Sequence, residues 1–555
     1  MTTSPSTSPS TRPSKSGFTA HLSRLTSFAT SPQAQPARLG FLGAVLITAG
    51  GLGAGSTRLH DPLLESLHLS WLRFGHGLVL SSILLWGGVA LMLAAWLWLG
   101  RRVIDRTATE YTMVATTGIW LAPLLLSVPL FSRDTYSYLA QGALLRDGLD
   151  PYAVGPVDNP NSLLDNVSPI WTTTTAPYGP GFILIAKFVT MLVGNDVVAG
   201  TMLLRLGMLP GLALLIWAAP RVARHIGADG ATALWICVLN PLVIIHLMGG
   251  VHNEMLMVGL MMAGIALTFS GRHLWGVSLI AAAVAVKATA GLALPFMVWV
   301  WARDMRNRRD VSAVKAFVTA SAGSALIFTA VFAVLSFAAG VGLGWLTALA
   351  GSVKIINWLT LPTAAANVIN AVGGLFLPVN FYAVLDVARI IGIALIALSL
   401  PFVWWRFRHT DREALTGIAV VMVIVVLLVP AALPWYYTWP LAVVAALAQS
   451  RRSIAIIAGL STWIMVIWKP DGAHGMYSWP HVLLSLACAA VAWYSLKNAP
   501  QGTRAVNKPR PWTVNRPRPR AVNKPRPRAV NKPSPGPGAP PHGPDASEEH
   551  QRAEH

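Results

Sequence analysis

The stretch FSRDTYSYLAQG, from Phe131 to Gly142, is a short polar run inside a chain that is otherwise mostly apolar. Of the 555 residues, 54% are hydrophobic and only 12% are charged, which is about half of the charged fraction of a soluble domain. Apolar stretches that can cross a hydrocarbon core of about 30 Å recur from residue 38 to residue 496. The composition excludes a soluble globular protein and predicts an all-α integral membrane protein, with this polar run at the end of a helix.

The chain divides into three parts. Residues 1–37 are rich in Ser, Thr and Pro, and residues 497–555 are basic and rich in Pro, so neither segment can bury a core and both are predicted to be disordered. Residues 38–496 are predicted to form a polytopic membrane domain with about 13 or 14 transmembrane helices. The expected stretches are 38–56, 77–99, 112–131, 197–218, 230–248, 254–271, 274–288, 290–303, 313–338, 381–405, 414–432, 437–449, 453–468 and 480–496.

Clusters of arginine in short loops orient these helices, because such loops stay on the cytoplasmic side. The clusters lie at residues 101–106, 221–224, 303–309, 406–412 and 451–452. If all of them are inside, both termini are cytoplasmic, and the acidic loop 132–180 lies on the outer face of the membrane. This assignment also requires that residues 182–194 form a re-entrant or interfacial helix, and that the run 274–301 breaks at Lys287.

Asp134 is the first candidate for a catalytic residue. It follows Arg133, and helical spacing places it on the same face as Tyr138, with Tyr136 between them. A carboxylate beside an arginine and two tyrosines, at the end of a membrane helix, fits chemistry on a sugar or a phosphate. The alternative is an ordinary acid in the first turn of a helix, stabilised by the helix dipole.

A second polar group, GGVHNEML, is expected on the same face of the membrane. His252 and Asn253 would bind sugar hydroxyls, and Glu254 would be a second candidate for the catalytic base. Alternatively, Glu254 only caps a helix and His252 lies at the membrane interface. No further His, Asp or Glu stands at ligand spacing, so no metal site and no cofactor are predicted, although a divalent metal is left open.

Two cations lie inside apolar stretches, where an unpaired charge is costly and usually faces a cavity or a partner. Lys287, in AAAVAVKATAG, is predicted to contact a phosphate in a cavity. Arg205 either does the same or extends its charged end to the interface.

Two outer loops supply the remaining candidates for substrate binding. Trp435 and Tyr436, in PWYYTW, would stack on pyranose rings or belong to the aromatic belt of the membrane. Lys469 and Asp471, in WKPDG, would contact a phosphate and a sugar or simply form a turn.

The net charge of +20 does not indicate a nucleic-acid partner. The charge comes from the arginine loops and from a tail that repeats units such as RAVNKPRP, and no basic patch with interleaved aromatics lies in the folded region. The tail would attract anionic membrane lipids, or it is a low-complexity extension.

Five long runs carry a resemblance to a known family. These runs are FSRDTYSYLAQGALLRDGLDPYAVGP, NVSPIWTTTTAPYGPGFILIAKFV, LNPLVIIHLMGGVHNEMLMVGL, AVKATAG and VPAALPWYYTWPL. They closely resemble the α-(1→6)-mannopyranosyltransferases, which are polyprenyl-phosphate-mannose-dependent C-type (GT-C) glycosyltransferases. The likeness covers about residues 20–495 and leaves the repeat tail outside.

The resemblance implies a GT-C fold in a bacterial cytoplasmic membrane, with re-entrant or interfacial helices and the active site on the outer, periplasmic face. It implies transfer of mannose from polyprenyl-phosphate-mannose to an α-(1→6)-mannan anchored on phosphatidylinositol mannoside, in lipomannan and lipoarabinomannan biosynthesis, with inversion. In this family an acid in an outer loop after an early span is taken as catalytic, which corresponds to Asp134; Lys287 and Arg205 would be phosphate partners. This chain departs from the simplest pattern, because two spans precede the one that leads into the acidic loop.

Three alternatives stay open from the sequence. The chain could be a paralogous mannosyltransferase, a family member that moves glucose or arabinose, or a transporter or flippase of lipid-linked sugars. Such transporters commonly repeat their first half, and no copy of SRDTYSY or HNE occurs elsewhere in this chain.

Overall fold

The computed structural model describes residues 23–24, 26–349 and 354–499. The described residues all belong to one unit, Met1–Gly502, and the second unit, Thr503–His555, lies outside them. The predictions for the N-terminal segment up to residue 22 and for the repeat tail from residue 500 therefore fall outside the described part of the chain.

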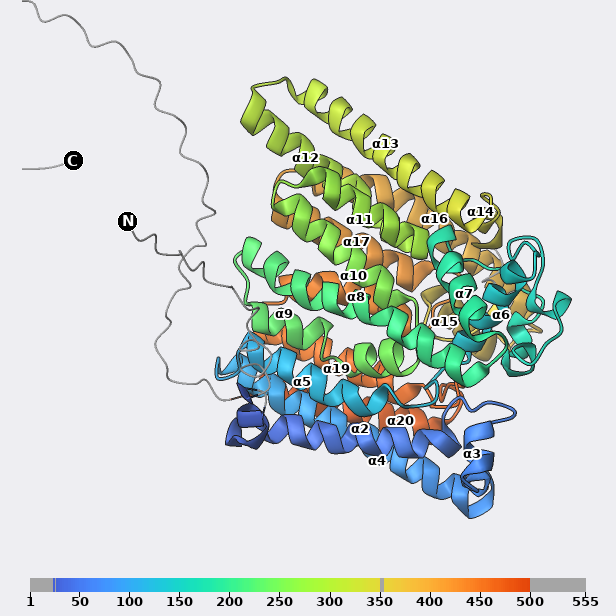
Figure 1. Cartoon of the computed structure of the whole chain (residues 1–555). Helices are drawn as coiled ribbons and strands as arrows, with labels where there is room; N and C mark the ends of the chain where they lie inside the picture. The colour runs from blue at the N-terminus through green and yellow to red at the C-terminus, as the bar shows by residue number, and fades with distance from the viewer. Residues whose placement is uncertain (1–22, 25, 350–353, 500–555) are drawn as a thin grey trace, which may run out of the picture. The chain divides into compact units, whose positions relative to one another are not determined.

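Each of the apolar stretches expected from the sequence contains a helix. Apart from α9, which is described below, these helices are α2 (Gln35–Ala54), α4 (Gly75–Ile104), α5 (Glu110–Leu124), α8 (Val197–His225), α10 (Glu254–Phe269), α11 (His273–Val286), α12 (Leu294–Arg309), α13 (Ala313–Ala339), α16 (Phe381–Arg406), α17 (Asp411–Leu428), α18 (Thr438–Leu447), α19 (Arg451–Ile467) and α20 (Trp479–Lys497). Figure 1 shows most of these helices running side by side. Within the described ranges no strand forms, and the one isolated bridge joins Trp468 to His474.

Further helices complete the fold. They are α3 (Pro62–Ser66), α6 (Asp134–Arg146), α7 (Pro180–Val193), α9 (Gly230–Cys237), α14 (Trp345–Ala348) and α15 (Leu361–Gly373), with short η segments that include η2 (Ser70–Arg73), η4 (Leu164–Asn166), η6 (Leu242–Gly249), η7 (Ala288–Ala293) and η9 (Pro434–Tyr437). Six described helices are long and apolar enough to cross a membrane alone, or up to seven if the bent pair α9 and η6 counts as one span. The remaining predicted spans are therefore shorter or broken helices.

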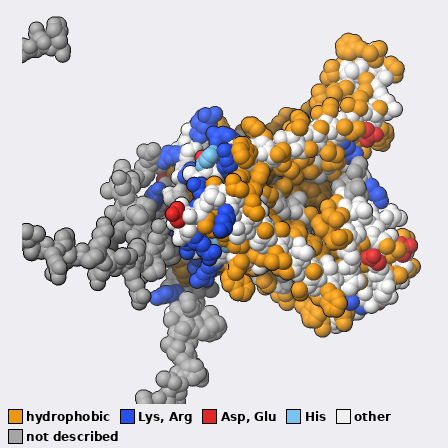
Figure 2. All heavy atoms as spheres, turned by 90° about the horizontal axis from the view of Figure 1, so that it is seen from above, with side chains coloured by type: hydrophobic (Ala, Val, Ile, Leu, Met, Phe, Trp, Pro, Cys, Tyr) orange, Lys and Arg blue, Asp and Glu red, His pale blue; other side chains and the backbone are white. Residues whose placement is uncertain are grey.

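Basic side chains gather at one end of the helices, as Figure 2 shows, and an apolar surface follows beyond them. Ion pairs tie the helix ends together here: Arg224 pairs with Glu110, and Asp411 lies 2.8 Å from His225 and 2.7 Å from Arg303. We call this the arginine-rich end. Large side chains such as Phe337 on α13 and Leu398 on α16 are exposed on the apolar surface, as expected for side chains that face lipid. The chain is thus built as a multi-pass membrane protein.

The run from α11 to α12 breaks at Lys287, as the charge pattern predicts. Lys287 has an extended backbone (φ −151°, ψ 128°), which ends α11 and precedes η7. His273, at the start of α11, lies 2.8 Å from Asp304, near the end of α12, and its ring stacks on Trp301. The chain therefore enters and leaves this hairpin at the arginine-rich end, with Lys287 at its turn.

Helix α7 returns rather than crossing the structure. Its start lies beside the hairpin turn, because the Gly179 N–H donates to the carbonyl of Val286 (3.4 Å). Past its end, Asn195 accepts a 2.9 Å hydrogen bond from Arg146, the last residue of α6. Figure 1 shows α6 and α7 together at the end opposite the arginine-rich one. Loop 132–180 and α7 thus form a layer over the hairpin turn.

Candidate active site

The turn that leads into α6 is fixed by residues far away in the sequence. The Phe131 N–H donates to the carbonyl of Pro470 (2.9 Å), and the Phe131 carbonyl accepts from the indole of Trp468 (3.1 Å). Phe131 has a φ of 65°, a conformation that non-glycine residues rarely adopt. Ser132 Oγ then accepts the backbone N–H of Asp134 (3.0 Å). The first N–H of α6 is therefore bonded to Ser132, and neither Asp134 nor the N-cap residue Arg133 provides a side-chain cap.

Asp134 lies at the wall of a cavity of about 260 Å³. The residue is 8% exposed, and the cavity is lined further by Trp171, Asn357, Trp435 and His474. Helix α6 is not one of the helices that can span the membrane. Burial is the main cause that raises the pKa of Asp134 to about 6. The charge of Glu254 raises this pKa further, and the charge of Lys287 lowers it. A carboxyl group with a pKa near the working pH suits a general base.

His252 links Asp134 to the aromatic wall of this cavity. Its Nδ1 atom lies 3.8 Å from Asp134 Oδ2 and 3.4 Å from the hydroxyl of Tyr138. Its ring stacks on Trp435, with the ring centroids 3.8 Å apart. Asn253 is fully buried beside it, and neither its amide nitrogen nor its amide oxygen has a hydrogen-bond partner among the described residues. The sequence-predicted residues Asp134, Tyr138, His252 and Trp435 thus lie together.

A buried ion pair stands behind this group. Glu254, the first residue of α10, accepts from Lys287 at the hairpin turn. The Lys287 ammonium also lies over the rings of Tyr436 (4.5 Å), Trp439 (5.4 Å) and Tyr178 (5.7 Å). Such cation–π contacts stabilise a cation that is removed from water. Lys287 and Tyr436 therefore belong to the site, while the predicted contact of Lys287 with a phosphate stays a prediction.

Close packing of α7 brings Tyr178 to this pair. At Gly179 an added Cβ atom would lie 2.4 Å from the carbonyl oxygen of Ala285, so the PYGP turn can approach the hairpin only with glycine there. Likewise, a Cβ atom added at Gly142 on α6 would lie 2.4 Å from the carbonyl oxygen of Ala186 on α7. These two glycines set the distance between the layers that carry Asp134 and Lys287.

Other predicted residues face backbone groups instead of the cavity at Asp134. The guanidinium of Arg205 donates to the carbonyls of Leu125, Met248 and Gly249 at 2.7 to 3.2 Å. The hydroxyl of Tyr136 donates to the Ser56 carbonyl (2.7 Å). The polar groups of Arg205 and Tyr136 are thus bonded to backbone carbonyls. Their predicted contact with substrate stays a prediction.

Arg133, Lys469 and Asp471 lie between two cavities. Arg133 donates to the carbonyl of Asn166 (3.1 Å) and lines both the cavity at Asp134 and a larger one, as Asp471 does. Lys469 lines the larger cavity alone. Asp471 Oδ1 accepts a hydrogen bond from the N–H of Ala473 (2.9 Å). This bond closes the turn that the sequence offered as the alternative to a substrate contact for WKPDG. The same turn carries Pro470, which holds Phe131.

Three further residues that line the cavity at Asp134 were not predicted from the sequence: Trp171, Asn357 and His474. Trp171 stands in the NVSPIW run and His474 in the loop after WKPDG, so their position in polar outer loops was a usable signal. Asn357 is in a long loop whose pairing with the Ala432 carbonyl (2.8 Å) has no signature in the sequence. No group of three or more His, Cys, Asp or Glu that could hold a metal is present in the described residues.

Comparison with known proteins identifies related chains. The family model "Alpha-(1->6)-mannopyranosyltransferase, N-terminal domain" matches residues 37–303, and the model "MptB C-terminal domain" matches residues 362–498. Alpha-(1->6)-mannopyranosyltransferase A of Mycobacterium tuberculosis is 71% identical over 89% of this chain and 97% of its own length. The protein of the same name from Corynebacterium glutamicum is 35% identical over 84% of this chain and its full length, and Alpha-(1->6)-mannopyranosyltransferase B of that organism is 31% identical over 74% of this chain. No solved structure matches the chain.

Proposed function

Because the chain belongs to the α-(1→6)-mannopyranosyltransferase family and is a glycosyltransferase, we propose that it elongates an α-(1→6)-mannan with mannose from polyprenyl-phosphate-mannose. The acceptor would be the mannan of lipomannan and lipoarabinomannan, carried on a phosphatidylinositol mannoside. Identity of 71% to an A-type relative, against 31% to a B-type relative, favours the A-type reaction over that of the paralogue. Membership of an enzyme family argues against a transporter.

The observation that carries the proposal is the position of Asp134. Its carboxyl group lines the aromatic cavity and lies beside His252, whereas Glu254 is fully buried and held by Lys287. A base must reach the hydroxyl from which it takes a proton. We therefore assign Asp134 as the base, whose pKa burial raises and the charge of Glu254 raises further.

The proposed reaction is a single displacement. The Asp134 carboxylate takes the proton of the acceptor 6-hydroxyl, whose oxygen attacks C1 of the donor mannose. The bond between C1 and the phosphate oxygen breaks, and its electron pair stays on the polyprenyl phosphate. Attack from the opposite face converts a β-linked donor into an α-linked product. Cations near the departing phosphate would stabilise the charge that develops on it.

The test is a transfer assay with purified protein in membranes. Radiolabelled polyprenyl-phosphate-mannose, polyprenyl-phosphate-glucose and polyprenyl-phosphate-arabinose are each supplied with a short α-(1→6)-mannoside acceptor. We expect label to enter the acceptor only from the mannose donor, through a linkage that an α-1,6-specific mannosidase removes. Transfer of glucose or arabinose instead would refute the donor, and a mannosidase-resistant product would refute the linkage or its stereochemistry.

A further inference from the structure

A larger cavity, of about 650 Å³, lies next to the one at Asp134. We call it the cationic cavity, because Arg58, Arg73, Arg133 and Lys469 line it. Its walls come from the end of α2 and the segment that follows it, the start of α4, and the turn at residues 469–471. The acid on its lining is Asp471, which it shares with the cavity at Asp134.

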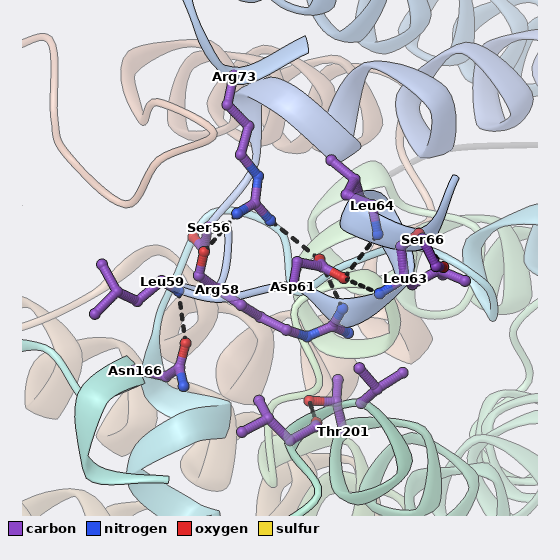
Figure 3. Close-up of polar contacts among 12 residues, drawn as sticks. Ser56, Arg58, Leu59, Asp61, Leu63, Leu64, Ser66, Arg73, Asn166 and Thr201 are labelled. Carbon is purple, nitrogen blue, oxygen red and sulfur yellow. Dashed lines mark hydrogen bonds and ion pairs between the residues drawn. The ribbon is translucent and has the colours of Figure 1, made fainter. Parts of the chain in front are cut away.

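Two of these cations are built into the fold around one carboxylate. Asp61 lies between them, 2.9 Å from Arg58 and 3.0 Å from Arg73, as Figure 3 shows. Asp61 also caps α3 by accepting the N–H groups of Leu63 and Leu64. One carboxylate therefore balances two guanidinium groups, and the cluster keeps an excess of positive charge.

These guanidinium groups also keep unused donors. Arg58 is 5% exposed, and the Nε atoms of Arg58 and Arg73 are buried without a hydrogen-bond partner among the described residues. Lys469, across the cavity, forms no ion pair within the described part of the chain. The cations that line the cavity, Arg58, Arg73, Arg133 and Lys469, therefore favour a ligand that accepts hydrogen bonds. With an excess of positive charge, that acceptor is an anion.

The rim of the cavity points to a lipid. Phe74, just before α4, is 71% exposed, and Leu59 and Leu78 are also exposed at the rim. Helix α4 is one of the helices that can cross a membrane, so its first turn lies where lipid headgroups meet the protein. An anion whose cavity has an apolar rim at this depth would carry an acyl or prenyl chain.

We propose that the cationic cavity binds the phosphate group of a membrane lipid. A polyprenyl monophosphate and the headgroup of an anionic glycerophospholipid share this chemistry. Arg guanidinium groups suit it because they can donate two parallel hydrogen bonds to phosphate oxygens. Binding of an anionic lipid at this site does not depend on the proposed transfer reaction. The choice of a polyprenyl monophosphate as that lipid does rest on the proposed function. Arg133 lines both cavities and so connects the phosphate to the neighbourhood of Asp134.

The test measures lipid binding to the purified full-length protein by native mass spectrometry. The lipids are undecaprenyl phosphate, phosphatidylglycerol and zwitterionic phosphatidylcholine. We expect at least one of the two anionic lipids to bind about tenfold or more tightly than phosphatidylcholine. Arg73→Gln and Lys469→Gln should each weaken this binding by about tenfold. Arg73 is chosen because Arg58 still pairs with Asp61 in that variant, so no buried carboxylate loses all its partners.

The matched control is Lys187→Gln on α7, because Lys187 is partly exposed and lines neither cavity. It should bind lipid like the wild type. Preference for undecaprenyl phosphate supports the site and assigns the carrier as its ligand, and preference for phosphatidylglycerol supports it with a bulk lipid. Equal binding of all three lipids, or unchanged binding by both folded variants, overturns the proposal. Asp134→Asn should bind lipid normally, so loss of mannosyl transfer there is separate from loss of this site.

Discussion

Asp134 and Glu254 are both buried acids in the first turn of a helix, but their surroundings differ and suit them to different roles. Asp134 opens onto a cavity and has His252 as its neighbour, whereas Glu254 is closed off and paired with Lys287. Separate environments for two carboxylates are a common way to divide acid and base roles. In the proposed reaction, this difference makes Asp134 the group that would contact the acceptor.

Replacing Asp134 by Asn should abolish most of the turnover without unfolding the protein. Ser132, and not the side chain of Asp134, accepts the N–H that begins α6, so the substitution leaves this hydrogen bond in place. Loss of a general base typically costs at least about 10² in rate. The transfer assay checks this, with Asp165→Asn as control because Asp165 is exposed and lines neither cavity. Near-normal transfer by folded Asp134→Asn would remove its assignment as the base.

The pH dependence of kcat/KM should report Asp134. The base acts only when deprotonated, so activity should rise with pH, with an apparent pKa of about 6 instead of 3.8. Glu254 raises this pKa, so Glu254→Gln should move the rising limb to lower pH. A profile recorded from pH 4 to 8 on both proteins decides it. A limb that stays in place or moves to higher pH in the variant would contradict the electrostatic link.

Single residues were predictable where a side chain has a side-chain partner. The polar runs around Asp134 and His252 predicted a functional site, and the structure places these two residues next to each other. Arg205 and Tyr136 were harder, because their partners are backbone carbonyls of Met248, Leu125 and Ser56. A carbonyl is present at every position of the chain, so the sequence cannot show which one a guanidinium or hydroxyl will reach.

The hairpin of α11, η7 and α12 carries its cation at the turn, and the turn is tied to the start of α10 through Glu254. The break at Lys287 was predicted from the requirement that all arginine-rich loops lie on the same side of the membrane. The partner was not predicted, because Glu254 lies 33 residues earlier and was interpreted as a base. The pairing follows from packing between helices, which a pattern along one helix does not specify.

Removing Lys287 should therefore destabilise the protein as well as slow transfer. Lys287→Met leaves the buried Glu254 charge without its partner, a change that costs about 3 to 5 kcal/mol in comparable pairs. The double variant Lys287→Met with Glu254→Gln removes both charges and should recover most of the loss. Thermal unfolding of the detergent-purified proteins measures this. If the single and double variants unfold at the same temperature, the pair does not hold the hairpin.

The contact between α6 and α7 makes another prediction. Gly142→Ala places a Cβ atom 2.4 Å from the Ala186 carbonyl, so the helices must separate. Overpacking of this kind costs about 1 to 3 kcal/mol, and the shift should also lower turnover. Gly118→Ala on α5 is the matched control, because nothing lies within 4 Å of the added atom and alanine favours a helix. Equal unfolding temperatures for the two variants would show that α6 and α7 tolerate separation.

At the level of the complete chain, charge is separated between the two ends of the helices. The arginine-rich end holds the ion pairs of Arg224 and Arg303, and the opposite end holds α6 with Asp134. The order of the helices along the chain could be predicted, because the hydropathy of each stretch marks it separately. Which helices become neighbours could not, because contacts such as Phe131 with Pro470 join parts of the chain that share no local pattern.

The positive-inside assignment predicts which end reagents can reach in whole cells. Cysteines at Ser162, near Asp134, and at Arg309, at the arginine-rich end, are both on exposed positions. In a background without Cys237 and Cys488, a membrane-impermeant maleimide should label Ser162→Cys in intact cells and Arg309→Cys only after lysis. The reverse pattern would place Asp134 in the cytoplasm and exclude a donor used on the outer face.

The bond between Phe131 and Pro470 also imposes an order in time on the making of this protein. Asp134 is synthesised early, but Trp468 and Pro470, which fix the turn before it, are among the last parts of the membrane domain to leave the ribosome. Trp435 and His474, on the cavity wall, also come late. A nascent chain that has inserted only its first helices thus holds the carboxylate without its chamber, and the enzyme becomes competent only when its final helices have been inserted.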